Sequence, residues 1–197
     1  QENLVKSHAC GTGEEIPIEV VRLMIYLKIQ SLSYGMSGVK VTTVEKLCEL
    51  LNKQVLPIVF KQGSLGASGD LAPLAHMSLL LLGLGECRYK GERMKADVAM
   101  KKAGIKAIKL GAKEGLALLN RTQFMSAYGV YNCILAEKLI YAANAIAAVS
   151  LDAFSGKYDP FLPELHTIRP HPGQISTASA IMKWTEGSEL GAREKKQ

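Results

Sequence analysis

The chain has 197 residues, of which 48% are hydrophobic and 21% are charged. This balance is typical of a protein with a packed core and excludes a disordered or low-complexity chain. The formal net charge is +6 at pH 7, but the basic residues are scattered and are not interleaved with aromatic ones, so we expect a solvated basic surface and no nucleic-acid partner.

The first third of the chain predicts helices joined by a short extended segment. Apolar residues recur at helical spacing from Pro17 to about Ser33, and proline is well tolerated at a helix start. Thr42 and Glu45 have the spacing of a capping box, which predicts a second helix that ends near residue 51. Segment 55–60 is apolar but contains a proline, so we expect an extended connector.

The middle of the chain contains a loop rich in glycine, followed by further short elements. Asp70 is a suitable N-cap for a helix through Leu82. Turn residues at 89–92 predict a small hairpin over 86–93, and Gly104 is expected to end a short helix that begins at residue 94.

The last part of the chain predicts long helices. Residues 113–150 are expected to start a central long-helix bundle, with a break near Asn120. Four prolines between 160 and 172 predict an irregular segment before a final helix from residue 173. No repeat or linker separates two cores, so residues 1–197 are expected to form a single, mostly α unit.

The remaining composition predicts where the protein acts. Four cysteines are widely spaced without a CxxC pair, so we expect neither a disulfide framework nor a metal site. No signal segment is recognisable, and polar residues interrupt the longest apolar stretch, so we predict a cytoplasmic protein with no membrane association.

The segment 62–76, Gln-Gly-Ser-Leu-Gly-Ala-Ser-Gly-Asp-Leu-Ala-Pro-Leu-Ala-His, has three interpretations. It could be a plain flexible loop before a helix. It could be a phosphate-binding loop, although it lacks the Gly-Lys-Ser/Thr ending and Asp70 would repel an anion. The third interpretation is cyclisation of Ala67-Ser68-Gly69, in which the Gly69 nitrogen attacks the Ala67 carbonyl and two waters are lost. Glycine favours this attack because it has no Cβ.

The sequence itself does not choose among the three, but the segment closely resembles the prosthetic-group loop of the aromatic amino acid ammonia-lyases. In that family the Ala-Ser-Gly triplet becomes 4-methylidene-imidazol-5-one, and the similarity here continues from Asp70 through His76. The resemblance therefore implies the ammonia-lyase (fumarase/aspartase-like) fold and an autocatalytic electrophile made from Ala67, Ser68 and Gly69, with no metal and no dissociable cofactor.

Two further segments resemble the same family. Residues 3–11 are similar to the segment in which histidine-specific lyases carry a Ser-His pair, so the resemblance implies that His8 contacts the substrate imidazole. Residues 114–120 are similar to a second signature, whose Asn, here Asn120, lies beside the prosthetic ring. The family usually has Gly after that Asn, and this chain has Arg121.

The resemblance covers the chain but not the whole family, whose members are longer. It implies an interior fragment of an enzyme that converts L-histidine to urocanate and ammonia, assembled as a homotetramer. The family's tyrosine base and several substrate contacts would lie outside these residues, so we expect the isolated fragment to be inactive. The alternatives are a lyase or aminomutase for phenylalanine or tyrosine, and a non-catalytic helical fragment that oligomerises.

Overall fold

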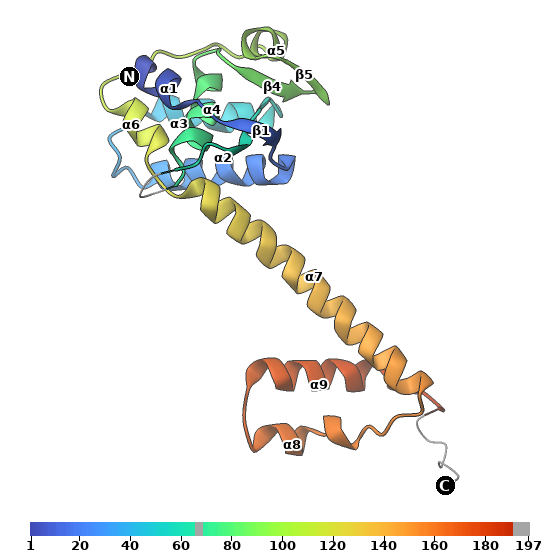
Figure 1. The fold of residues 1–197 in the computed structure, drawn as a ribbon. Helices are drawn as coiled ribbons and strands as arrows, with labels where there is room; N and C mark the ends of the chain where they lie inside the picture. The colour runs from blue at the N-terminus through green and yellow to red at the C-terminus, as the bar shows by residue number, and fades with distance from the viewer. Residues whose placement is uncertain (66–68, 191–197) are drawn as a thin grey trace. The chain divides into compact units, whose positions relative to one another are not determined.

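The computed structural model describes residues 1–65 and 69–190. By its internal contacts the chain divides into two compact units, Gln1–Asn132 (unit 1) and Cys133–Gln197 (unit 2). The chain is mostly helical, as predicted (Figure 1). The two units differ from the single unit that we expected. Nothing in the sequence marks the boundary, because it falls inside the uninterrupted helix α7 (Gln123–Ala153) and has no linker-like composition.

Helices near the N-terminus supply much of the core of unit 1. They are α1 (Glu2–His8), α2 (Ile18–Ser33) and α3 (Val41–Asn52). α2 follows Pro17, as predicted. The predicted capping box is wrong, because α3 begins at Val41, and Thr42 lies inside it. The backbone N–H of Lys40, the N-cap, donates instead to the distant Glu114 carboxylate at 2.9 Å, which takes the place of a local cap.

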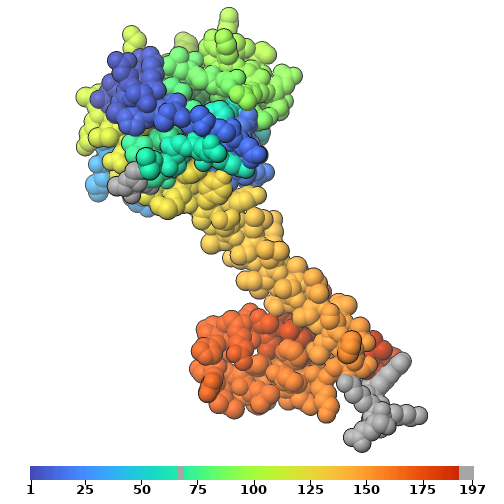
Figure 2. All heavy atoms as spheres, in the orientation of Figure 1, coloured from blue at the N-terminus to red at the C-terminus, as the bar shows by residue number. Residues whose placement is uncertain are grey.

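Short strands connect these helices in two small antiparallel sheets. Their bounds are β1 (Thr12–Glu15), β2 (Leu56–Pro57), β3 (Phe60–Gln62), β4 (Glu86–Tyr89) and β5 (Glu92–Lys95). β1 pairs with β3, and β2, β4 and β5 form the second sheet in that order. The hairpin expected over 86–93 is therefore confirmed, and the expected connector over 55–60 contributes to both sheets. Figure 2 shows the blue N-terminal segment and the teal segment of β3 side by side on one face of unit 1.

The other helices of unit 1 are α4 (Leu71–Leu81), α5 (Ala96–Ala103), α6 (Glu114–Leu119) and the beginning of α7. α4 is apolar on all sides and almost entirely buried, so it forms the centre of the unit. Gly104 ends α5 in a left-handed conformation with φ of 67°, as expected for a glycine at this position.

Unit 2 contains the remainder of α7 with short elements that follow it. These are a 3-10 helix, η1 (Asp159–Phe161), then α8 (Pro163–Thr167) and α9 (Pro172–Trp184). The rings of Tyr141 and Trp184 meet edge to face at 5.7 Å between centroids, and thereby pack α7 against α9. The proline-rich break and the last helix agree with the sequence prediction.

The part of α7 in unit 2 exposes large apolar side chains. Leu139, Ile146 and Val149 are 70%, 66% and 69% exposed and recur at helical spacing. By length and composition, the helical stretch Glu114–Ala153 could also cross a membrane, with a mean hydropathy of 1.5 in its most apolar window. Buried core helices of soluble proteins have similar compositions, so this is weak evidence for a membrane span.

Candidate active site

The three segments predicted to form the site meet in unit 1. α1, which ends at His8, packs against α4 and α6, and α4 and α6 also pack against each other. α4 follows the predicted prosthetic loop directly, and α6 ends just before Asn120. Residues 8, 69 and 120, far apart in the sequence, therefore lie at the ends of three helices that contact one another.

The flanks of the predicted prosthetic-group loop are described, although Gly66, Ala67 and Ser68 lie outside the described residues. β3 leads into the loop and α4 leads out of it. Gly63 and Gly69 both have positive φ, 112° and 71°, which side chains with a Cβ rarely adopt. Gly63 also approaches the backbone of Gly11 so closely that a Cβ would lie 2.8 Å from the Gly11 Cα. The chain entering the loop is thus fixed against the segment that follows α1.

Asp70, which follows the predicted triplet, is the N-cap of α4 by position but makes no side-chain cap there. Its buried carboxylate accepts hydrogen bonds from the backbone N–H groups of Phe124 at 2.8 Å and Met125 at 3.3 Å. These groups lie in the first turn of α7, so Asp70 caps α7 instead of α4. The end of the loop is therefore attached to the chain that follows Asn120.

His8 lies at the C-terminal end of α1 and is partly buried. Its Nδ1 is 2.8 Å from the backbone carbonyl oxygen of Leu4 and 3.1 Å from the hydroxyl of Ser7. A carbonyl oxygen can only accept, so Nδ1 carries the proton and Nε2 of the neutral ring is an acceptor. The hydroxyl of Ser7 donates to the same carbonyl at 3.0 Å.

Asn120 follows α6 with an extended backbone, and its N–H donates to the carbonyl of Leu116 at 2.9 Å. The predicted helix break is therefore confirmed. The neighbouring Arg121 is exposed, and its Nη2 donates to the hydroxyl of Ser37 at 3.0 Å. This contact attaches Arg121 to the loop between α2 and α3.

Glu114 anchors the start of α6. It is 1% exposed and accepts from the backbone N–H of Lys40, the backbone N–H of Gly111 and the hydroxyl of Thr43, the last at 2.7 Å. Burial raises the pKa of Glu114, but these hydrogen bonds together with the charge of Lys40 lower it by more, so the pKa lies below its usual value. Because α6 is only six residues long, this anchor fixes the position of Asn120 at its other end.

A buried lysine lies close to these residues and was not singled out in the sequence analysis. Lys28 of α2 has no exposed surface, and its Nζ donates to the side-chain oxygen of Gln123 at 3.4 Å. Burial, and then the charge of Arg121, lower the pKa of Lys28 to about 7, against the attraction of Asp70. A signal was available, because Lys28 is four residues from both buried Met24 and buried Leu32 and so lies on the apolar stripe of α2.

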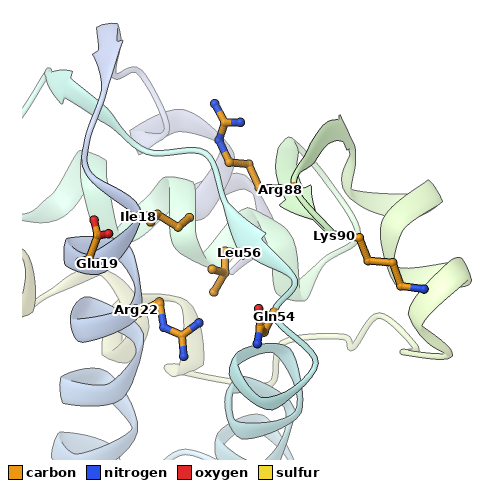
Figure 3. A pocket seen from close by; sticks show the side chains of 8 residues that line it. Ile18, Glu19, Arg22, Gln54, Leu56, Arg88 and Lys90 are labelled. Atoms are coloured by element: carbon orange, nitrogen blue, oxygen red, sulfur yellow. The ribbon is translucent and has the colours of Figure 1, made fainter.

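A separate pocket lies between α2, Gln54 and the hairpin of β4 and β5. It is lined by Ile18, Glu19, Arg22, Gln54, Leu56, Arg88, Lys90 and Gly91. Figure 3 shows the side chains of Arg88 and Lys90 extending away from Leu56, and Arg88 is paired with Glu15 at 2.8 Å. Of the predicted site residues that the structure describes, His8, Gly69 and Asn120 do not line this pocket. Among residues 1–65 and 69–190, no group of three or more His, Cys, Asp or Glu side chains could hold a metal ion.

Comparison with known proteins decides the family. The aromatic amino acid lyase family matches the chain over residues 1–197. The chain belongs to the aromatic amino acid lyase family. It is 49% identical over 194 residues to histidine ammonia-lyase of Caldanaerobacter subterraneus subsp. tengcongensis, covering 98% of this chain and 38% of that protein. The chain therefore spans well under half the length of this curated relative.

Solved structures of the lyase family have the same fold. Histidine ammonia-lyase from Trypanosoma cruzi matches with a TM-score of 0.85 and 35% identity, over 91% of this chain and 36% of that one. Phenylalanine aminomutase from Pantoea agglomerans matches with a TM-score of 0.88 and 34% identity, over 96% of this chain and 36% of that one. These matches confirm the expected ammonia-lyase fold. Fold similarity extends to lyases and aminomutases alike, so it does not by itself assign a substrate.

Proposed function

We propose that this chain acts as part of a histidine ammonia-lyase, which converts L-histidine to urocanate and ammonia. The observation that supports the proposal is the mutual contact of α1, α4 and α6, because His8 ends α1, the predicted loop precedes α4 and Asn120 follows α6. The high identity to a histidine ammonia-lyase, together with the Ser7-His8 pair, favours histidine over phenylalanine or tyrosine.

The loop flanks suit a prosthetic group made from Ala67-Ser68-Gly69. Gly69 has the freedom in φ that close approach of its nitrogen to a preceding carbonyl requires, and Gly63 provides a second such position at the entry. A methylidene-imidazolone there would supply the electrophile that amino acid side chains lack. Asp70 directs its carboxylate to α7, so the N-terminus of α4 keeps its positive partial charge next to the loop.

His8 would select the substrate by hydrogen bonding. Its Nδ1–H donates to Leu4, which leaves Nε2 as an acceptor for an N–H group of an imidazole. A phenyl ring offers no such donor, so a site built around this acceptor would favour histidine. Asn120 would orient the prosthetic ring through its amide, held in place by the anchored α6.

We propose a homotetramer, as the family resemblance implies, in the cytoplasm, and the exposed apolar face of α7 is consistent with assembly. Leu139, Ile146 and Val149 would be buried against neighbouring helices of the bundle. Glu137, Lys138 and Asp152 lie on the same helix, and burial of these charges in a lipid bilayer would be unfavourable. A tyrosine elsewhere in the full-length protein would then act as the base, as the family resemblance implies.

The direct test is product formation by the full-length protein that contains these residues. We expect urocanate from L-histidine, with no comparable product from L-phenylalanine or L-tyrosine, and loss of activity in Ser68→Ala. The isolated 197-residue chain should not form urocanate. Product from phenylalanine or tyrosine would support the alternative lyases, and a folded full-length protein inactive on all three would support a non-catalytic role.

A further inference from the structure

A junction beside the predicted site joins the segment after His8 to the helix after the prosthetic loop. The backbone N–H of Gly11 donates to Nε2 of His76 on α4 at 2.9 Å. The two residues are 65 positions apart, so the bond is a tertiary contact. Two residues separate His8 from Gly11, and Gly69 lies two positions before Leu71, the first residue of α4.

The junction has little free space around Gly11. A Cβ on Gly11 would lie 3.0 Å from Nε2 of His76 and 3.1 Å from the carbonyl oxygen of Gln62. From the other side, Gly63 comes so close that a Cβ there would lie 2.8 Å from the Gly11 Cα. Gly11 is therefore held between the His76 ring and the strand that enters the loop, and β1 continues this contact by pairing Thr12 with Gln62.

The ring of His76 is fixed on its other side as well. It meets the ring of Phe60 edge to face at 5.2 Å between centroids, with an interplanar angle of 78°. Because Nε2 accepts the Gly11 hydrogen, the neutral ring must carry its proton on Nδ1. Burial lowers the pKa of His76 below its usual value, so the neutral acceptor is the stable form at neutral pH.

We propose that His76 is a positioning residue that sets where His8 lies relative to the prosthetic loop, by accepting the Gly11 N–H. This role rests on the proposed function, because it assumes that His8 contacts the substrate. His76 itself does not touch the reacting atoms. Its effect passes along Gly11, Cys10 and Ala9 to the end of α1, where Cys10 N–H also donates to the carbonyl of His8 at 2.9 Å.

The first test measures the contact itself. Amide hydrogen exchange at Gly11 should be slow in the wild-type full-length protein and at least tenfold faster in His76→Ala, because the acceptor is lost. His76→Gln, whose side-chain oxygen can accept, should restore most of the protection. Equal protection of Gly11 in the wild type and in His76→Ala would overturn the proposed contact.

The second test measures how the Gly11–His76 contact affects substrate binding. His76→Ala should raise KM for L-histidine by about tenfold with a smaller change in kcat, because ground-state binding through His8 is weakened. His76→Gln should recover most of that loss. Gly11→Ala, which leaves His76 intact but forces it apart from the backbone, should raise KM similarly. Leu79→Ala is the matched control, because Leu79 is a partly buried residue of α4 that packs against Gly85 instead.

The outcomes separate this proposal from the proposed function. A wild-type protein that forms urocanate while His76→Ala keeps an unchanged KM would overturn only the positioning role. A KM raised equally by Leu79→Ala would also overturn it, since the effect would then be general destabilisation. A wild-type protein that forms no urocanate would overturn the proposed function, and the role of His76 toward substrate with it.

Discussion

The carboxylate of Asp70 accepts a hydrogen bond from the backbone N–H of Phe124 at 2.8 Å. Asp70 follows the predicted prosthetic triplet, and Phe124 lies in the first turn of α7, just after Asn120. One buried side chain thus connects the first signature to the helix that follows the second signature, more than 50 positions away.

Substitutions of Asp70 should distinguish the contribution of helix capping to stability from the contribution of the carboxylate charge. Asp70→Ala is expected to lower the free energy of unfolding by roughly 1–2 kcal/mol, because two N–H groups of α7 lose their acceptor. Asp70→Asn should change it much less, since its side-chain oxygen can still accept and burial already disfavours the charge by raising the pKa of Asp70. Urea denaturation of both variants measures this. Equal losses in the two variants would contradict the capping role.

The Glu114 anchor predicts a loss of stability in acid. Its pKa is lowered by hydrogen bonds and the Lys40 charge, which outweigh burial. The carboxylate therefore stabilises the fold fully above pH 4.5, and this stabilisation is lost as pH falls through the lower folded pKa. Glu114→Gln should cost roughly 1–3 kcal/mol at pH 7, because the amide cannot accept from all three donors. Glu92→Gln, at an exposed residue of β5, should change the unfolding free energy little, both at pH 7 and in acid below pH 4.5.

Lys28→Met should stabilise the protein. The folded pKa of Lys28 is about 7, well below its unfolded value, so the unfolded chain binds more protons between these values and stability rises with pH across that range. The gain from Lys28→Met should be roughly 1–4 kcal/mol at or below pH 7 and should vanish as pH approaches about 10.4. Lys101→Met, at an exposed residue of α5, serves as the control. A gain of the same size at both ends of this pH range would contradict burial of the charge.

Arg121 should act on Lys28 through charge. Arg121→Gly is expected to raise the pKa of Lys28, because the Arg121 charge is the second cause of its lowering after burial. Arg121→Lys keeps the charge and should leave that pKa nearly unchanged. An NMR titration of the Lys28 side chain measures both. Because Arg121 is exposed and bonded to Ser37, we also expect Arg121→Gly to retain lyase activity in the full-length protein.

Local patterns in the sequence predicted the elements, and tertiary contacts explain the differences. Helix α2 after Pro17, the hairpin over 86–93 and the end of α5 at Gly104 depend on nearby residues and were predicted. The capping box at Thr42 failed because Glu114, 74 positions from Lys40, caps α3 instead. The two-unit division had no signal, because α7 is continuous across it.

In the candidate site, too, sequence motifs predicted individual residues but not the tertiary contacts between segments far apart in the chain. Motif similarity predicted His8, Gly69 and Asn120 as site residues, and the helices next to them, α1, α4 and α6, contact one another. Motif similarity did not reveal the Gly11–His76 hydrogen bond or the capping of α7 by Asp70, because each joins residues more than 50 positions apart. Ala67 and Ser68 lie outside the described residues, so their cyclisation stays a prediction.

The most direct measurement is the mass of the peptide that contains Ala67, Ser68 and Gly69, taken from the folded full-length protein. If the lyase assignment is right, this peptide is lighter than its sequence predicts by two waters, and the difference disappears in Ser68→Ala. A wild-type peptide with the unmodified mass would contradict the assignment.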